Sequence, residues 1–238
     1  MNDGSMRPLF VTVLAPAVLS AVITFAHGQP AKSPYPEMAP LDRYLIPDRD
    51  AEIALARTAA PPSISGDAEV MVLGRNGYTS AAEGHNGFLC LVERSWGAST
   101  PDRDFWNPKT RSPVCFNAAA ARTYVPIYLL KTRLVLAGAS KTGIVHGIQS
   151  ALEEKKLAAL EPGAMAYMMS KQQYLSDEAV RWHPHLMFFV SGDSGKTWGA
   201  DLPGSPVMAA NDPEEGATIF LVWVSQWSDG TPGPPTSH

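Results

Sequence analysis

The sequence predicts an α+β fold, a single domain with a mainly antiparallel sheet and two to three helices packed on it. Strand-like segments separated by turn residues fill residues 68–95, and two helical patterns follow between residues 117 and 157. Three more strand-like runs occupy the last third of the chain. Strands, then helices, then strands are typical of α+β domains rather than of alternating α/β folds.

An export signal is expected over residues 1–28. Arg7 precedes an apolar run from Pro8 to Ala26, and the small residues around position 27 fit a cleavage site. An uncleaved membrane anchor is the alternative, but Pro16 interrupts the run, so cleavage is favoured. We therefore expect a periplasmic or secreted protein that meets the membrane only through this segment, before cleavage.

The next segment, residues 29–62, is predicted to be a Pro-rich leader followed by a short helix over 50–60. The α+β domain at 63–229 then opens with strands over 68–74, 78–83 and 87–95. Asn76-Gly77 and Asn86-Gly87 indicate tight turns between them, because both residues tolerate positive φ. The expectation is a meander whose third strand, apolar on both sides, is covered on both faces.

Two helices follow this meander. Asn117 is predicted to cap the first helix, and Pro126 to kink or split it. Ser140 is predicted to cap the second, which has an apolar stripe around Ile144 and Ile148. Strands are expected over 164–170, 185–191 and 218–227, and residues 230–238 are predicted to be a disordered tail.

Charge excludes one large class of partners. The chain of 238 residues has 19 basic and 23 acidic residues and a formal charge of −4, with neither sign gathered in a block. A nucleic-acid partner is not expected, because such partners require a basic surface. A small molecule or another protein remains as the partner.

Cys90 and Cys115 are the only two cysteines. In an oxidising compartment, an isolated pair is most simply interpreted as one disulfide, here closing a loop of about 26 residues. The alternative is two buried thiols that never meet.

A divalent metal such as zinc is the first ligand hypothesis. His183 and His185 stand one residue apart before an apolar strand, so on a strand both rings project from the same face. That spacing is common in half-sites for zinc, with His85 and Glu93 as available partners. The alternative is an aromatic-packed strand entry next to Trp182.

A long polar loop at 99–113 is the second candidate site, since aperiodic loops of this length often carry function. Its proposed ligand-binding residues are Arg94, Trp96, Phe105 and Trp106, with Arg103 and Lys109 as further polar groups. The alternative is a solvated loop whose aromatic side chains pack onto the core.

The stretch from Ser191 to Trp198 fits two further motifs. Its "GDSG" resembles the trypsin-family nucleophile segment, but a helical region and the spacing of His85 and Asp102 argue against a protease. Its letters also fit the Asp-box turn of sialidase-like propellers, although the motif occurs once. We interpret it as a structural β-hairpin turn, with Asp193 binding turn amides, Gly195 at a strained position and Trp198 covering the hairpin.

Several longer segments, among them "NGFLCLVERSW", "FWNPKTRSPVCFN" and "MAYMMSKQQYLSD", together resemble a family of exported bacterial proteins with no assigned function. The likeness spans most of residues 68–230. It implies one intact exported domain and no particular activity. Two hypotheses therefore stand: a metal-binding protein or metal-assisted enzyme at His183 and His185, and a non-catalytic binding module that uses the loop at 99–113.

Overall fold

A computed structural model describes Met1 and residues 33–235 of the chain, so the predicted export signal lies outside the described residues apart from Met1. From residue 33 onward they belong to one compact unit. Within them no helix is long and apolar enough to cross a membrane. The sheet has eight strands: β1 (Glu69–Gly74), β2 (Gly77–Ala82), β3 (Leu89–Glu93), β4 (Ser112–Phe116), β5 (Met165–Met168), β6 (His185–Ser191), β7 (Val207–Asp212) and β8 (Ala217–Trp223).

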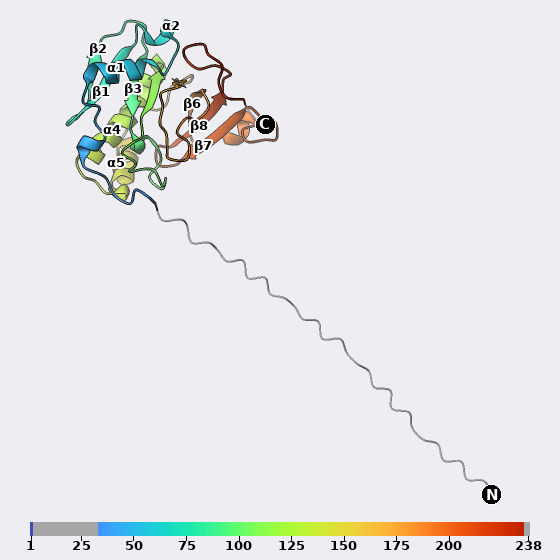
Figure 1. Ribbon diagram of the computed structural model, residues 1–238. Coiled ribbons are helices and arrows are strands. Elements are labelled where there is room, and N and C mark those ends of the chain that lie inside the picture. The colour runs from blue at the N-terminus through green and yellow to red at the C-terminus, as the bar shows by residue number, and fades with distance from the viewer. Residues whose placement is uncertain (2–32, 236–238) are drawn as a thin grey trace. The chain divides into compact units, whose positions relative to one another are not determined.

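The helices exceed the two to three expected, and the described part of the chain contains five. They are α1 (Arg49–Arg57), α2 (Pro62–Ser65), α3 (Ala118–Thr123), α4 (Val125–Leu136) and α5 (Lys141–Glu153). In Figure 1, α1 and α2 lie near β1 and β3, and β6, β8 and β7 form the other end of the sheet. The α+β class is confirmed.

Strand order is β2-β1-β3-β4-β5-β6-β8-β7, and the sheet is mixed because β1 and β3 run parallel. The other neighbouring pairs are antiparallel. The predicted meander is wrong at its second turn: β3 pairs with β1 and not with β2, so Asn86 and Gly87 belong to a crossover. The first turn is the expected hairpin, but only Gly77 has positive φ, at 114°, whereas Asn76 does not.

Helix starts agree with the predicted caps. The side chain of Asn117 accepts a hydrogen bond from the Ala120 amide, and that of Ser140 accepts one from the Gly143 amide. Pro126 sits in the first turn of α4, directly after α3 ends, which is the predicted split. Local capping chemistry was therefore sufficient to place these boundaries.

Two hydrophobic clusters cover the two faces of β3. Cys90 and Val92 face α1, whereas Leu91 packs with α4 and α5 in the larger cluster. This confirms the prediction that β3 is covered on both sides. Because alternate residues share a face, Glu93 projects to the same side as Leu91, toward α4.

The predicted disulfide is present. Cys90 and Cys115 are directly opposite one another in the β3–β4 ladder, with Cα atoms 4.0 Å apart. The bond closes the segment that contains the loop at 99–111, and both residues are fully buried. It therefore ties the two strands from which that loop emerges.

Both ends of the segment 33–235 are packed onto the rest of the domain. In the leader, Tyr44 is fully buried and its hydroxyl donates to the Trp106 carbonyl at 2.8 Å. At the other end, the start of the predicted disordered tail folds back, because the Trp227 amide donates to Thr231 and the Gly233 amide donates to Ser225. Leader and tail thus contribute structure that composition alone did not indicate.

Candidate functional site

An open pocket of about 430 Å³ lies where β3 ends, a size suited to a small ligand. One wall is formed by residues between Glu93 and Asp104. The other wall is formed by the beginning of β4 and by the segment around Ser176. Its lining residues are Glu93, Arg94, Ser95, Gly97, Ala98, Asp102, Arg103, Asp104, Thr110, Ser112, Met168, Leu175, Ser176 and Glu178. Five of these fall within the predicted loop at 99–113, so that loop forms much of the pocket.

Glu93 is the most unusual group of the pocket. Its side chain is half-buried and forms no hydrogen bond or ion pair with the residues that the structure describes. Burial, and after it the negative charge of Glu215, raise the pKa of its carboxyl to about 8, although the positive charge of Lys131 opposes the shift. The Glu93 carboxyl is therefore largely protonated at neutral pH.

Ser95 provides a second polar group without a partner. Its side chain is only 4% exposed, it lines the pocket, and its Oγ has no hydrogen-bond partner among residues 33–235. A buried hydroxyl left unpaired costs about 1–3 kcal/mol. Ser112 lies directly opposite Glu93 in the β3–β4 ladder, so both side chains project toward the same face.

A buried ion pair fixes the chain behind the pocket. Lys131 of α4 donates to Glu215 Oε1 at 2.8 Å and to the Ala98 carbonyl at 2.9 Å, with both charged side chains nearly inaccessible. Next to it, Glu214 accepts hydrogen bonds from the amide and the hydroxyl of Thr100. The turn between β7 and β8 therefore holds residues 98–100 in place.

The outer rim is held by a second group of contacts. Arg103 donates to Glu178 at 2.5 Å, and Asp177 accepts from Lys109 at 2.7 Å and from Tyr35 at 2.6 Å. The hydroxyl of Tyr174 also donates to Asp177. The hydrogen bond from Lys109 is the largest of the effects that lower the pKa of Asp177. Leader, loop and the segment after β5 thus close one side of the pocket together.

The predicted aromatic binding residues do not face this pocket. Trp96 and Phe105 are fully buried and Trp106 is 7% exposed, and all three belong to the main hydrophobic core. Trp96 uses its indole N–H to bond Thr132 at 3.0 Å. These residues anchor the loop onto the core, which was the alternative interpretation.

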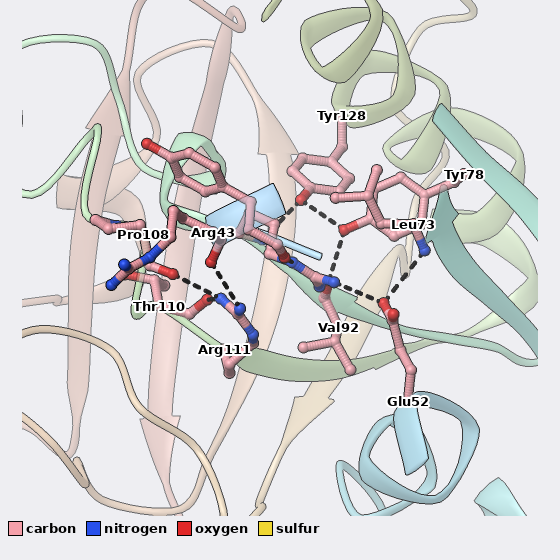
Figure 2. A network of polar contacts seen from close by, with 11 residues as sticks. Arg43, Glu52, Leu73, Tyr78, Val92, Pro108, Thr110, Arg111 and Tyr128 are labelled. Carbon is pink, nitrogen blue, oxygen red and sulfur yellow. Dashed lines mark hydrogen bonds and ion pairs between the residues drawn. The ribbon is translucent and has the colours of Figure 1, made fainter. Parts of the chain in front are cut away.

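Arg94 lines the pocket, but its guanidinium is committed elsewhere. It donates to Glu52 at 2.8 Å, to the Tyr44 carbonyl at 2.6 Å and to the Val92 carbonyl. Figure 2 shows this network, in which Glu52 also accepts from the Leu73 amide and the hydroxyls of Tyr78 and Tyr128 meet. Arg94 therefore joins α1, the leader and β3 and is not available to a ligand.

Arg111 lies at the edge of the same network and binds only carbonyl oxygens, those of Arg43, Pro108 and Thr110 (Figure 2). Burial, with the charge of Arg94 second, lowers its pKa to about 10. These contacts fix the end of the loop just before β4. They position the pocket without entering it.

The structure does not bring the three candidate metal ligands together. His185 is buried, with its Nδ1 2.7 Å from the His183 carbonyl, and burial lowers its pKa to about 4. His183 stacks on Trp223, with ring centres 4.6 Å apart. His85 lies before β3, which β4 and β5 separate from β6, and its Nδ1 is 3.1 Å from Asp67.

Over the described residues, no group of three or more His, Cys, Asp or Glu side chains is placed to hold a metal ion. The ring of Trp182 packs edge-on against His185 at 4.8 Å, so an aromatic strand entry surrounds the pair. Zinc binding stays a prediction from the sequence.

The segment from Ser191 to Trp198 is not a hairpin turn, because β6 and β7 both pair with β8 and not with one another. It begins a crossover that includes the 3-10 helix η3 (Gly195–Trp198). Asp193 makes no hydrogen bond within the described chain, and Gly195 does not have positive φ, so both expected roles are wrong. Trp198 does cover the sheet, stacked on Phe220 with centres 4.2 Å apart.

Comparison with protein-family models, with curated proteins and with solved structures finds no match for this chain. The resemblance to exported bacterial proteins therefore stays a prediction.

Sequence reasoning considered Glu93 only as a metal partner and overlooked Ser95 and Lys131. One available signal was the lone acidic residue that ends an otherwise apolar strand, where burial and a raised pKa are expected.

Proposed function

We propose that this protein is an exported, non-catalytic binding module whose pocket at the end of β3 takes a small polar molecule. The observation that carries the proposal is the pair of unpartnered polar groups, Glu93 and Ser95, in one pocket. Nearly all buried polar groups in proteins are hydrogen-bonded, and Ser95 Oγ is buried without a partner among the described residues, so a ligand that bonds it would remove an existing cost. The predicted signal segment and the disulfide support export.

Two features favour binding over catalysis. The pocket walls are tied by the ion pairs Lys131–Glu215 and Arg103–Glu178, which pre-organise the site and lower the entropic cost of binding. The pocket residues also include no His or Cys. A binding role therefore needs only the groups that the pocket contains.

A thermal-shift screen with a library of small polar metabolites tests the proposal. We expect at least one compound to raise the Tm of the wild-type protein and to fail in Ser112→Leu, because the larger side chain occupies the pocket beside Glu93. The control is Glu83→Gln, at an exposed position whose side chain forms no hydrogen bond or ion pair with the described residues. Stabilisation that persists in Ser112→Leu, or a screen in which no compound stabilises the protein, would overturn the proposal.

A further inference from the structure

We propose that the ligand of this pocket is a small organic cation, bound through an ammonium or guanidinium group that Glu93 accepts as its counter-ion. This inference rests on the proposed function. It commits that function to one chemical class of ligand.

The charges around the pocket favour a cation. Its lining includes four carboxyl groups, those of Glu93, Asp102, Asp104 and Glu178, and two guanidinium groups, those of Arg94 and Arg103. Both guanidinium groups already have carboxylate partners. An anionic ligand would find no unpaired guanidinium, whereas a cation would meet three carboxyl groups without an ion-pair partner among the described residues, those of Glu93, Asp102 and Asp104.

The carboxylates of Asp102 and Asp104, at the mouth of the pocket, are not neutralised by a basic residue of the described chain. Asp102 accepts from the Asp104 amide at 2.7 Å, and Asp104 accepts from the Asn107 side chain at 2.9 Å. Neither forms an ion pair within the part of the chain that the structure describes. They are suited to attract a cation toward the deeper group, Glu93.

Two charged groups on neighbouring elements act on Glu93, those of Glu215 and Lys131. Lys131 of α4 is the nearest cation, but it is bonded to Glu215, whose negative charge acts on Glu93 in the opposite direction. Tyr124 and Tyr128 of the same helical region have pKa values raised by burial and are neutral at ordinary pH. Lys141 does not line this pocket, and its ammonium group lies 4.9 Å from the centre of the Phe105 ring and 3.5 Å from the Asp102 carbonyl.

Ser95 is the independent observation that points to a ligand. Its hydroxyl is more than nine-tenths buried, unpartnered and part of the pocket wall. A serine Oγ accepts as well as donates hydrogen bonds, so it can accept a second N–H from an ammonium or a guanidinium. Glu93 and Ser95 together supply two acceptors for one cationic head group.

Binding of a cation should also displace a proton. In the empty pocket Glu93 holds its proton up to about pH 8, and a bound cation stabilises the carboxylate. Below pH 8 the affinity should therefore rise by up to about tenfold for each pH unit. At pH 7 the protein should release close to one proton for each ligand bound.

Three probes of equal length separate the charge classes: 1,4-diaminobutane, 1,4-butanediol and succinate. Isothermal titration at pH 6, 7 and 8, in two buffers of different ionisation enthalpy, measures affinity and proton release together. We expect the diamine to bind, with an affinity that rises at least tenfold from pH 6 to pH 8, and the diol and succinate to bind at least tenfold more weakly. Methylguanidinium serves as a second cation.

Variants connect the effect to Glu93. In Glu93→Gln the diamine should bind at least tenfold more weakly at pH 8 and release no proton, whereas Glu83→Gln should behave like the wild type. If the diol or succinate bound more tightly than the diamine, and this binding were lost in Ser112→Leu, the proposal of a cationic ligand would be overturned. The proposal that the pocket binds a small polar molecule would then still stand. Absence of diamine and guanidinium binding, or diamine binding that Ser112→Leu leaves unchanged, would also overturn the cation, and the metabolite screen then decides the pocket separately.

Discussion

Lys131 and Glu215 form a buried ion pair, Nζ to Oε1 at 2.8 Å, that joins helix α4 to the turn between β7 and β8. The two residues are 84 positions apart in the sequence, and the same ammonium group bonds the Ala98 carbonyl behind the pocket. Three distant segments therefore depend on one charge.

Lys131→Met should lower the free energy of unfolding by about 3–5 kcal/mol, because it leaves the Glu215 carboxylate buried without a counter-ion. Urea unfolding at pH 7 measures this. In the double variant Lys131→Met with Glu215→Leu, much of the loss should be recovered. A single variant that loses under 1 kcal/mol would show that the pair does not hold the turn.

Glu93 predicts a pH dependence of stability. Its pKa is raised by burial from about 4.5 in the unfolded chain to about 8, so the folded state binds more protons between those values. Stability from this group is therefore fully present below about pH 4.5 and is lost as the pH rises to 8. His185, whose pKa is lowered to about 4, acts in the opposite direction: its contribution to stability rises as the pH increases from about 4 to about 6.5.

The difference between wild type and Glu93→Gln isolates this effect. From pH 6.5 to pH 8 the wild type should lose stability relative to the variant in urea unfolding, and above pH 8.5 the difference should be constant. Parallel curves across the whole range would mean that Glu93 titrates normally.

The disulfide should stabilise the domain through the loop that it closes. Cys90→Ala with Cys115→Ala should lower the free energy of unfolding by about 3–4 kcal/mol, from the entropy regained by the unfolded chain and from the buried sulfur atoms removed. Mass spectrometry after alkylation without reductant should detect no free thiol in the wild type. Two alkylated cysteines in protein from an oxidising compartment would contradict the bond.

The sequence predicted correctly those features that depend on residues close together in the chain, and it failed for features that depend on distant residues. Asn117 and Ser140 cap helices through atoms three residues away, so their letters were sufficient. The pairing of β3 with β1 was missed because it depends on a crossover. In that crossover Gly84 passes so close to β1 that a Cβ atom would stand 2.0 Å from the Glu69 amide nitrogen. The Asn86-Gly87 pair in the sequence gives no sign of this close approach.

The candidate site shows the same limit. The loop at 99–113 was identified from its length and polarity, but its aromatic residues were expected at the rim and are in the core. Glu93 is part of a pocket only because Met168, Ser176 and Glu178 come to lie beside it from another part of the chain. The periodicity of one strand predicts on which face of the sheet a side chain lies. It does not predict which residues from other parts of the chain pack against that side chain.

Arg94 should be as sensitive as Lys131, because its charge is fully buried against Glu52. Glu52→Gln should cost about 3–5 kcal/mol of unfolding free energy by leaving the guanidinium without a counter-ion. Asp42→Asn is the matched control, since the Asp42–Arg75 pair is exposed and should cost at most about 1 kcal/mol. Equal losses in the two variants would rule out a structural role for the buried pair.

The crossover after β6 gives the last prediction, which concerns three side chains with different contacts. Thr218 is fully buried, and its hydroxyl accepts from the Ser194 amide at 2.9 Å and donates to the Gly192 carbonyl. Thr218→Val keeps the shape of the side chain and removes both hydrogen bonds, so it should cost about 1–3 kcal/mol of unfolding free energy.

Trp198→Ala should cost about 1–2 kcal/mol, because the half-exposed indole stacks on Phe220. Asp193→Ala should stay within about 0.5 kcal/mol, since its carboxylate bonds nothing that the structure describes. Urea unfolding of the three variants measures this order, and an Asp193→Ala loss as large as that of Thr218→Val would restore Asp193 as the residue that organises the turn.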